Sequence, residues 1–289
     1  MFLVTGITGN VGGAAAHRLL KNGHAVRALA RDPKKAAAWS EKGVEVRQGD
    51  FTDVGAITEA LQGVEAAYLM VPPLLSIGPG FPEAKAMIAT FSEALRKAPP
   101  PRLVVLSSVG SEQSSKLGLI TTTHLLEEAL ADLPFPTAFV RAGSFLENYA
   151  FALGPAASTG YFDTFLIPTD RRFMMVAAED IGNEVARLLT SKWSGRKVVE
   201  LGSPMSADDL AGAMGNVLGR PIEARSIPRD QWTARLRAQG MEPVWTAMFE
   251  EMEDGFNSGW IASGVPGTEP VAATLTATEF FTKLRNARA

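Results

Sequence analysis

Short apolar, β-branched segments alternate with amphipathic segments over the first 140 residues of the chain. This alternation is typical of repeated strand–helix–strand units, in which parallel strands form one sheet and helices cover its faces. The amphipathic segments are long enough for the right-handed crossovers that such units need. The expected strands are Phe2–Thr5, Ala25–Ala30, Val44–Arg47, Ala66–Met70, Leu103–Ser107 and Ala138–Arg141, and the expected helices are residues 10–21, 33–42, 53–62, 80–97 and 120–132.

Glycine, proline and aromatic residues interrupt this alternation after residue 142. We therefore expect an α/β protein with a Rossmann-type doubly wound parallel sheet over residues 1–150 and a smaller, mostly helical substrate lobe over residues 151–289. Residues 172–201 contain a helical pattern and an apolar segment that can return to the sheet, so the two units would interleave. The helices expected here are residues 179–191, 206–218, 229–239 and 243–256, and the expected strand is Lys197–Leu201.

The composition excludes several classes of function. The 28 Lys and Arg side chains and the 31 Asp and Glu side chains give a net charge of −3, so no overall positive field draws the chain to nucleic acid. The absence of cysteine excludes disulfides and thiolate metal sites. The three histidines, His17, His24 and His124, do not pair at the spacing of metal ligands, and we expect no metal.

The chain shows no sign of a membrane or export segment. Its N-terminus has no basic leader, and no apolar stretch approaches the roughly 20 residues that a membrane-spanning helix needs. The lack of cysteine fits a reducing compartment. We expect a cytoplasmic protein without a membrane partner.

A glycine-rich segment joins the first expected strand to the first expected helix. Gly6, Gly9 and Gly12 follow directly after Thr5. The first glycine permits a tight turn, the second lets backbone N–H groups approach a pyrophosphate, and the third lets the helix pack closely on the strand. The helix N-terminus adds partial positive charge for an anion. This context predicts a dinucleotide site, and the alternative is a merely structural turn.

The residues after the second expected strand indicate which dinucleotide binds. Arg31 stands where an acidic residue usually binds the ribose 2′-hydroxyl, and Asp32, Pro33, Lys34 and Lys35 follow it. A guanidinium can bind a 2′-phosphate through charge-assisted hydrogen bonds, with Lys34 or Lys35 adding charge, so NADP(H) is the expected cofactor. A second interpretation, compatible with the first, is a solvated helix start that Asp32 caps.

Asp50 follows the third expected strand, within the sequence Gly49-Asp50-Phe51. Its carboxylate can accept a hydrogen bond from the adenine amino group of a dinucleotide. It can equally belong to a cap or a turn, because aspartate is common in both. The sequence does not decide between these two interpretations.

Seven segments together resemble the NmrA-like group of atypical short-chain dehydrogenases, and the similarity spans most of the chain. This resemblance implies a Rossmann fold that binds NADP(H). The group includes NADPH-dependent quinone reductases, other small-molecule reductases and a redox-sensing regulator that binds a dinucleotide without turning it over. The segments are Gly6-x-x-Gly9-x-x-Gly12, Ala30-Arg31-Asp32-Pro33, Gly49-Asp50-Phe51, Val71-Pro72-Pro73, Leu106-Ser107-Ser108-Val109-Gly110, Arg141-x-Gly143-x-Phe145-x-x-Asn148 and Glu179-Asp180-Ile181-Gly182. The cofactor-binding residues expected on these grounds are Gly6, Thr8, Gly9, Asn10, Val11, Gly12, Arg31, Lys35, Asp50, Phe51, Val71, Pro72, Ser107, Gly143 and Phe145.

The usual catalytic triad of a short-chain dehydrogenase is absent. That triad contains a serine, and a tyrosine four residues before a lysine that lowers the pKa of the phenol. Ser107 or Ser108 stands where the serine is expected. None of Tyr68, Tyr149 and Tyr161 begins a Tyr-x-x-x-Lys sequence.

His124 is a candidate to contact the cofactor ribose or to donate a proton. Relatives in the group often carry Lys or His about four residues ahead of a glutamate in this segment, and His124 precedes Glu128 by that spacing. The ordinary pKa of histidine lies near neutrality, as a proton donor requires. The apolar register of the expected helix instead places Thr123 at this position, and His124 is then a helix-start residue without a catalytic task.

The segment after the sixth expected strand lies where ligands bind in open α/β sheets, at the carboxyl ends of the strands. Phe145 can form a wall for the nicotinamide, and Asn148 or Tyr149 can face a substrate. The alternative for each of these side chains is the core of the lobe.

These observations lead to two hypotheses. The first is an NADPH-dependent oxidoreductase that transfers hydride to a quinone or a related small carbonyl acceptor without the Ser-Tyr-Lys triad. The second is a non-catalytic NADP(H)-sensing regulatory protein that binds a protein partner. A homodimer is compatible with either. A closed pocket beside the nicotinamide favours the enzyme, whereas a large exposed apolar patch over residues 205–260 favours the sensor.

Overall fold

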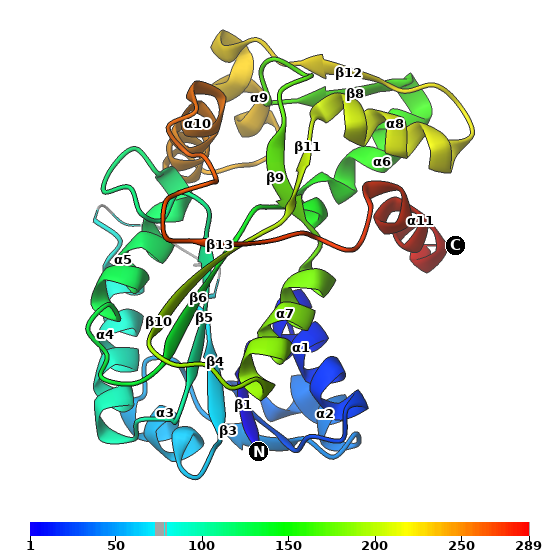
Figure 1. Cartoon of the computed structure of the whole chain (residues 1–289). Coiled ribbons are helices and arrows are strands. Elements are labelled where there is room, and N and C mark those ends of the chain that lie inside the picture. Colours follow the sequence, from blue (N-terminus) through cyan, green and yellow to red (C-terminus); the bar gives the residue numbers. More distant parts are fainter. Residues whose placement is uncertain (73–77, 79, 289) are drawn as a thin grey trace.

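The computed structural model describes residues 1–72, 78 and 80–288, and its centre is an eight-stranded sheet (Figure 1). The strand order is β13-β10-β6-β5-β4-β1-β2-β3, and all neighbouring strands are parallel. This confirms the expected Rossmann-type α/β fold. The strands are β1 (Phe2–Thr5), β2 (Val26–Ala30), β3 (Glu45–Gln48), β4 (Ala66–Leu69), β5 (Leu103–Ser108), β6 (Thr137–Ala142), β7 (Ser144–Phe145), β8 (Tyr161–Thr164), β9 (Phe173–Val176), β10 (Arg196–Leu201), β11 (Ser203–Met205), β12 (Glu223–Ser226) and β13 (Glu269–Val271).

Helices cover both faces of the sheet. Figure 1 shows α1 and α7 on one face and α3, α4 and α5 on the other. Successive residues of a strand point to opposite faces, so Val4 is buried in the core beside α1 and α7, and Leu3 in the core beside α3 and α4. The helices are α1 (Asn10–Lys21), α2 (Ala37–Ser40), α3 (Val54–Leu61), α4 (Pro82–Lys97), α5 (Thr121–Ala129), α6 (Leu153–Thr159), α7 (Ala178–Thr190), α8 (Ala207–Leu218), α9 (Trp232–Ala238), α10 (Pro243–Ser258) and α11 (Ala277–Arg288), and the 3-10 segments are η1 (Pro33–Ala36), η2 (Gly118–Ile120), η3 (Leu146–Ala152) and η4 (Arg229–Gln231).

Helices α1 and α7 lie unusually close because a glycine stands between them. A Cβ atom at Gly182 of α7 would lie 2.6 Å from the backbone nitrogen of Ala15 and 2.8 Å from the carbonyl oxygen of Val11. The chain enters α7 from the lobe and continues into β10, which pairs in parallel with β6. Within residues 172–201 the chain thus returns to the sheet. The division of the chain at residue 150 stays a prediction.

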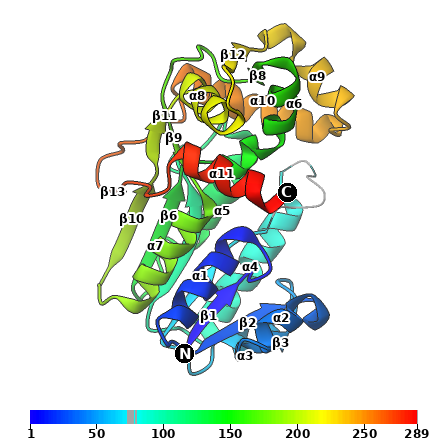
Figure 2. The ribbon, with the colours of Figure 1, turned by 90° about the vertical axis from the view of Figure 1, so that its right-hand side faces the viewer.

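The lobe above the sheet in Figures 1 and 2 has an apolar core of its own. Two small sheets, β11-β9-β7 and β12-β8, share this core with α6, α8 and α11. Phe162, Met214 and Phe281 are buried there. The strands of these sheets are only two to four residues long, so their alternation is too short to be recognised in the sequence. For this reason mainly helices were expected in the lobe.

One expected element differs from the structure, and two elements, β13 and α11, were not expected. The helix expected over residues 33–42 is the 3-10 segment η1 followed by the short α2, and Gly43, whose φ is +85°, turns the chain after it. Strand β13 contains Pro270 and lies at the edge of the sheet, where a missing N–H is tolerated. Helix α11 follows it and was not expected. Pro73 of the quoted motif lies outside the described residues.

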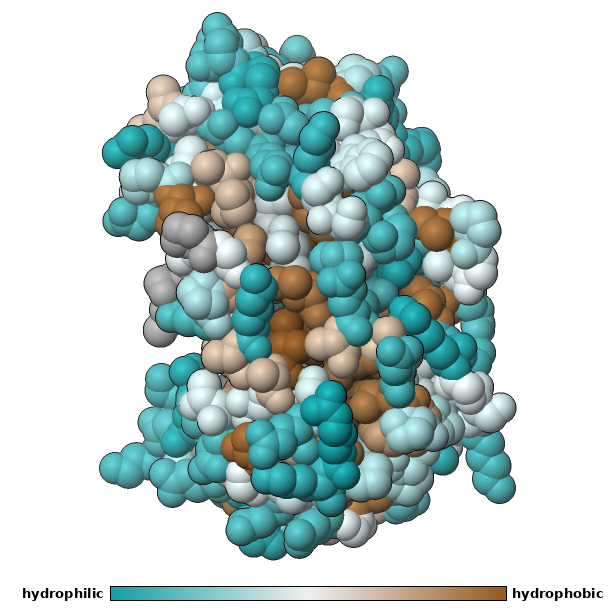
Figure 3. All heavy atoms as spheres, turned by 90° about the vertical axis from the view of Figure 1, so that its left-hand side faces the viewer, coloured by the Kyte–Doolittle hydropathy of each residue, from teal (hydrophilic) through white to brown (hydrophobic). Residues whose placement is uncertain are grey.

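Figure 3 shows the face of the molecule that carries α4 and α5. Apolar residues gather across the middle of this face, and hydrophilic residues cover the regions above and below it. Within residues 1–72, 78 and 80–288, no helix is both long and apolar enough to cross a membrane. The homodimer considered for this chain stays a prediction.

We expect the substitution Gly182→Ala to destabilise the protein, because its new methyl group has no space between α1 and α7. Overpacking of this kind costs about 1–3 kcal/mol of unfolding free energy, measurable by urea denaturation. Gly212→Ala is the matched control, since Gly212 lies inside α8 with open space around it and alanine favours a helix by up to about 1 kcal/mol. Equal effects of the two substitutions would contradict the close contact.

Candidate functional site

The glycine-rich turn after β1 has the backbone geometry that the sequence predicts. Gly6 has a φ of +63°, which favours glycine, and the N–H of Gly9 donates to the carbonyl oxygen of Gly6 at 2.9 Å. A Cβ atom at Gly12 would lie 2.6 Å from the carbonyl carbon of Gly6 and 2.7 Å from the carbonyl oxygen of Thr5. The first and third glycines are therefore required by the shape of the turn itself.

The N-terminus of α1 is free to bind an anion. Gly9 is the N-cap, and no side chain accepts a hydrogen bond from the first N–H groups of this 12-residue helix. The first turn also contains no acidic residue, so the partial positive charge of the helix end is not neutralised there. Val11 is buried in the core and can offer a ligand only its backbone. The turn and helix end fit a pyrophosphate.

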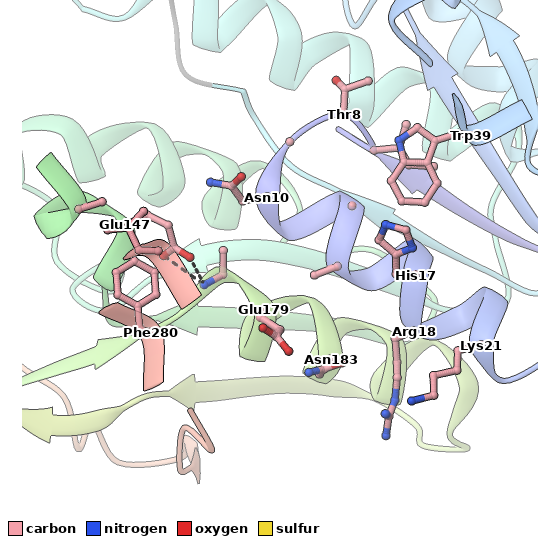
Figure 4. A pocket seen from close by; sticks show the side chains of 17 residues that line it. Thr8, Asn10, His17, Arg18, Lys21, Trp39, Glu147, Glu179, Asn183 and Phe280 are labelled. Atoms are coloured by element: carbon pink, nitrogen blue, oxygen red, sulfur yellow. Dashed lines mark hydrogen bonds between the residues drawn. The ribbon is translucent and has the colours of Figure 1, made fainter. Parts of the chain in front are cut away.

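A groove of about 830 Å³ begins at this turn and follows α1 (Figure 4). Thr8 and Asn10 border one end of it, and His17, Arg18 and Lys21 border the other. The ring of His17 stacks on Trp39 of α2, with 4.4 Å between the ring centroids, and burial lowers the pKa of His17. The groove runs along α1 and α7, away from the strand ends of β5 and β6, so we do not place hydride chemistry in it.

Arg31 is exposed at the end of β2, where the sequence places it. Its side chain is 73% exposed, and its Nε lies 4.0 Å from Oδ2 of Asp50, too far for a hydrogen bond. The guanidinium thus has its donors available for an anion, with Lys35 in the following 3-10 segment. Asp32 caps that segment by accepting from the N–H of Lys34 at 2.9 Å. The cap and a phosphate site are compatible.

Asp50 forms a turn. Its Oδ1 accepts hydrogen bonds from the N–H of Thr52 at 2.9 Å and from its hydroxyl at 2.8 Å. These hydrogen bonds lower the pKa of Asp50, and the charge of Arg31 lowers it further. The structure therefore shows Asp50 in a turn, while its contact with adenine stays a prediction. Phe51 packs on Phe91 in the core, and Val71 and Pro72 follow the end of β4.

Ser107 lies at the carboxyl end of β5, beside a buried ion pair. Its hydroxyl donates to Oε1 of Glu127 at 2.5 Å. Glu127 receives two hydrogen bonds from Arg141 of β6, at 2.9 and 2.7 Å, and Arg141 also donates to Glu112 at 2.8 Å. Since the proton of Ser107 is engaged in this network, only the lone pairs of its oxygen can serve a ligand.

The segment after β6 is held from two sides. A Cβ atom at Gly143 would lie 2.6 Å from the carbonyl carbon of Met174, so the absence of a side chain lets the two backbones approach. Strand β7 pairs with β9 there, with Ser144 opposite Met175. The carboxylate of Glu147 accepts from the N–H of Ala178, at 3.0 and 3.2 Å, and so caps α7. The contacts at Gly143 and Glu147 hold the backbone between these two residues, and with it the direction of its side chains.

Those side chains line a second cavity, of about 360 Å³, between the strand ends and the lobe. The sequence-predicted residues that the structure brings together here are Ser107, Gly143, Phe145, Asn148 and Tyr149. Most of the remaining wall is apolar and aromatic. It consists of Leu119, Ile120, Phe151, Phe162, Phe165, Leu166, Phe173, Phe249, Met252 and Phe256, with the polar residues Ser108, Ser144, Asp163, Thr164 and Glu253.

Two ionisable side chains on this wall have strongly shifted pKa values. Burial raises the pKa of Tyr149, which lies 3.2 Å from the hydroxyl of Ser144. Burial also raises the pKa of Glu253 to about 7, and the charge of Asp254 contributes. Oε2 of Glu253 is buried without a hydrogen-bond partner. Glu253 was not among the residues expected at the site, although an acidic residue within the apolar stripe Phe249, Met252, Phe256 of a helix is a usable signal.

His124 does not reach this cavity. Its Nδ1 lies 2.9 Å from the carbonyl oxygen of Ser111, and its Nε2 lies 3.3 Å from Oε2 of Glu128. Thr123, the other residue considered for this position, contacts the hydroxyl of Ser111 at 2.7 Å. In the part of the chain that the structure describes, no three His, Asp or Glu side chains are placed to hold a metal ion. The catalytic role of His124 stays a prediction that the local contacts do not favour.

The comparisons with known proteins agree with these motifs. Over 263 residues the chain is 27% identical to quinone oxidoreductase 2 of Escherichia coli, covering 90% of this chain and 89% of that protein. Over 273 residues it is 31% identical to a Streptomyces griseus (4-alkanoyl-5-oxo-2,5-dihydrofuran-3-yl)methyl phosphate reductase, covering 92% and 90% of the two chains. The solved NADPH-dependent quinone oxidoreductase of Escherichia coli, complexed with NADPH, has a TM-score of 0.83 at 25% identity and covers 99% of this chain and 100% of that one. Residues 1–264 match the NmrA-like family, and the chain belongs to it.

Proposed function

We propose that the protein is an NADPH-dependent oxidoreductase that reduces a quinone or a related small carbonyl compound. The observation that carries this proposal is the aromatic cavity at the carboxyl ends of β5 and β6, on the same edge of the sheet as the glycine-rich turn. Ligands of open parallel sheets bind at this edge. The named activities of two relatives, a quinone oxidoreductase and a (4-alkanoyl-5-oxo-2,5-dihydrofuran-3-yl)methyl phosphate reductase, support a reductase.

The residues present fit NADP(H). Gly6, Gly9 and Gly12 leave space at the uncapped N-terminus of α1 for the pyrophosphate, with Thr8 and Asn10 beside it. Arg31 and Lys35 supply positive charge for the 2′-phosphate. Val71 and Pro72 follow the end of β4, and Gly143 lines the cavity. When bound, the cofactor supplies hydride, and the protein supplies binding, orientation and electrostatics.

The cavity fits a flat, uncharged acceptor. Its wall contains aromatic rings from both sides of the site, Phe145 from β7 and Phe249 and Phe256 from α10. No lysine or arginine lines it among the described residues, so a strongly anionic substrate would find no counter-charge. Asn148 provides a donor and an acceptor that can orient a carbonyl group.

A panel of acceptors tests this function. We expect the purified protein to oxidise NADPH in the presence of small quinones, and less efficiently with aldehydes or with quinones that carry a sulfonate group. Absorbance of NADPH measures the rate, and a titration of NADPH alone measures binding. Binding of NADPH without oxidation by any acceptor would overturn the enzyme and favour the sensor. Against the sensor, Val244 and Trp260, the two most exposed large apolar side chains within residues 205–260, lie at opposite ends of α10.

Arg31→Ala tests the choice of cofactor. A charged hydrogen bond contributes about 1.5–3 kcal/mol, so the wild-type protein should bind NADPH roughly 10- to 150-fold more tightly than NADH. The substitution should remove most of this preference by weakening NADPH binding alone. Arg96→Ala, which removes a positive charge from the exposed side of α4, is the control. A variant at Arg31 that keeps the full preference would show that this guanidinium only faces solvent.

A further inference from the structure

Helix α10 places one acidic side chain in the cavity and three outside it. Phe249, Met252, Glu253 and Phe256 all line the cavity, because residues three and four apart share one face of a helix. Glu253 is the charged member of an otherwise apolar face. The acidic residues on the other faces, Glu250, Glu251 and Asp254, do not line the cavity.

Each of those three neighbours has a partner, whereas Oε2 of Glu253 has none among the described residues. Glu250 and Asp254 contact the guanidinium of Arg229 at 3.0 and 2.8 Å, and Glu251 accepts from the N–H of Gly118 at 2.9 Å. Oε2 of Glu253 is buried and has no hydrogen-bond partner. Burial of a carboxylate oxygen without a partner disfavours the charged form and so raises the pKa of the group.

The other groups on the cavity wall cannot replace it. Tyr149 holds its proton far above neutral pH, because burial raises its pKa and the charge of Glu253 adds to that effect. The carboxylate of Asp163 is engaged in ion pairs with the guanidinium groups of Arg225 and Arg235, at 3.1 and 2.5 Å. Among the described residues around the cavity, Glu253 is thus the carboxyl group without an ion-pair partner, and burial raises its pKa to about 7.

We propose that Glu253, as the neutral carboxylic acid, is the proton donor to the acceptor in this cavity. The inference rests on the proposed function, since it concerns the second half of the same reduction. The cofactor, when bound, would supply the hydride, and Glu253 supplies the proton. The O–H bond of the carboxylic acid breaks, a new O–H bond forms on the acceptor, and the resulting carboxylate takes a proton from water before the next turnover.

This assignment explains how reduction proceeds without a Tyr-x-x-x-Lys pair. A general acid is most effective when its pKa lies near the working pH, and burial in an aromatic cavity raises the pKa of Glu253 to about 7. Tyrosine would need a nearby positive charge to lower its pKa to that range, and neither lysine nor arginine lines the described part of the cavity. The chain thus obtains an acid with a suitable pKa by raising the pKa of a carboxyl group, and not by lowering that of a tyrosine.

The substitution Glu253→Gln tests the proposal, because an amide keeps the shape but cannot release a proton. In the wild-type protein, kcat with a quinone should fall tenfold per pH unit above about pH 7. E253Q should lower kcat by on the order of 10²-fold or more and remove this pH dependence, with NADPH affinity unchanged. Glu242→Gln, the same change of side chain at the exposed start of α10, should behave as wild type.

A measurement without cofactor tests the buried proton itself. The pKa of Glu253 is raised on folding, so its contribution to stability is full at low pH and is lost as pH rises from the usual range of glutamate to about 7. The unfolding free energy of E253Q relative to wild type should therefore increase between pH 5 and pH 8, about the range of this titration, whereas that of E242Q should not.

The outcomes separate the inference from the proposed function. Wild-type protein that reduces no acceptor overturns both. Wild-type activity that E253Q retains, with its pH dependence intact, overturns the role of Glu253 alone. A stability difference between E253Q and wild type that does not change with pH also overturns it, because the carboxyl group would then not be held neutral.

Discussion

The position of α1 depends on two backbone contacts that leave no space for a methyl group. At Gly12 the helix meets the turn after β1, and at Gly182 it meets α7; a Cβ atom at either glycine would lie 2.6 Å from a backbone atom of the neighbouring segment. Together they hold the uncapped end of α1 at the edge of the sheet, where its N–H groups can meet an anion. Since the chain enters α7 from the lobe, the same contacts join the lobe to the glycine-rich turn after β1.

A second constraint fixes the opposite side of the site. Arg141 and Glu127 form a buried pair with two hydrogen bonds, and Ser107 donates to the same carboxylate. Removal of one member of such a pair leaves a buried charge uncompensated, at a cost of about 3–5 kcal/mol. The ends of β5 and β6 are thus locked to α5 directly beside the cavity. Ser107, at the position of the usual catalytic serine, thus belongs to this hydrogen-bond network.

The features that could be predicted from the sequence are those that short-range patterns of residues determine. The strands of the sheet and the glycine turn follow from apolar periodicity and from the steric needs of Gly6 and Gly12. The lobe strands and the proton donor depend on contacts between distant segments, which periodicity does not report. His124 has the right ordinary pKa but contacts Ser111 and Glu128, whereas Glu253 has an ordinary pKa that is too low and acquires a suitable one only by burial.

The placement of Glu253 depends in turn on how α10 meets the sheet edge. Gly118, with a φ of +52°, lies so close to α10 that a Cβ atom there would be 2.8 Å from the backbone nitrogen of Met252. The N–H of Gly118 also donates to Glu251 on the same helix. The backbone contact and the hydrogen bond together fix α10 against the segment that leads into α5. Helix α5 is in turn bound to β5 and β6 through Glu127. The proposed acid and the strand ends that face it therefore belong to one continuous set of contacts, so a fold without the usual triad can still hold a proton donor on the wall of this cavity.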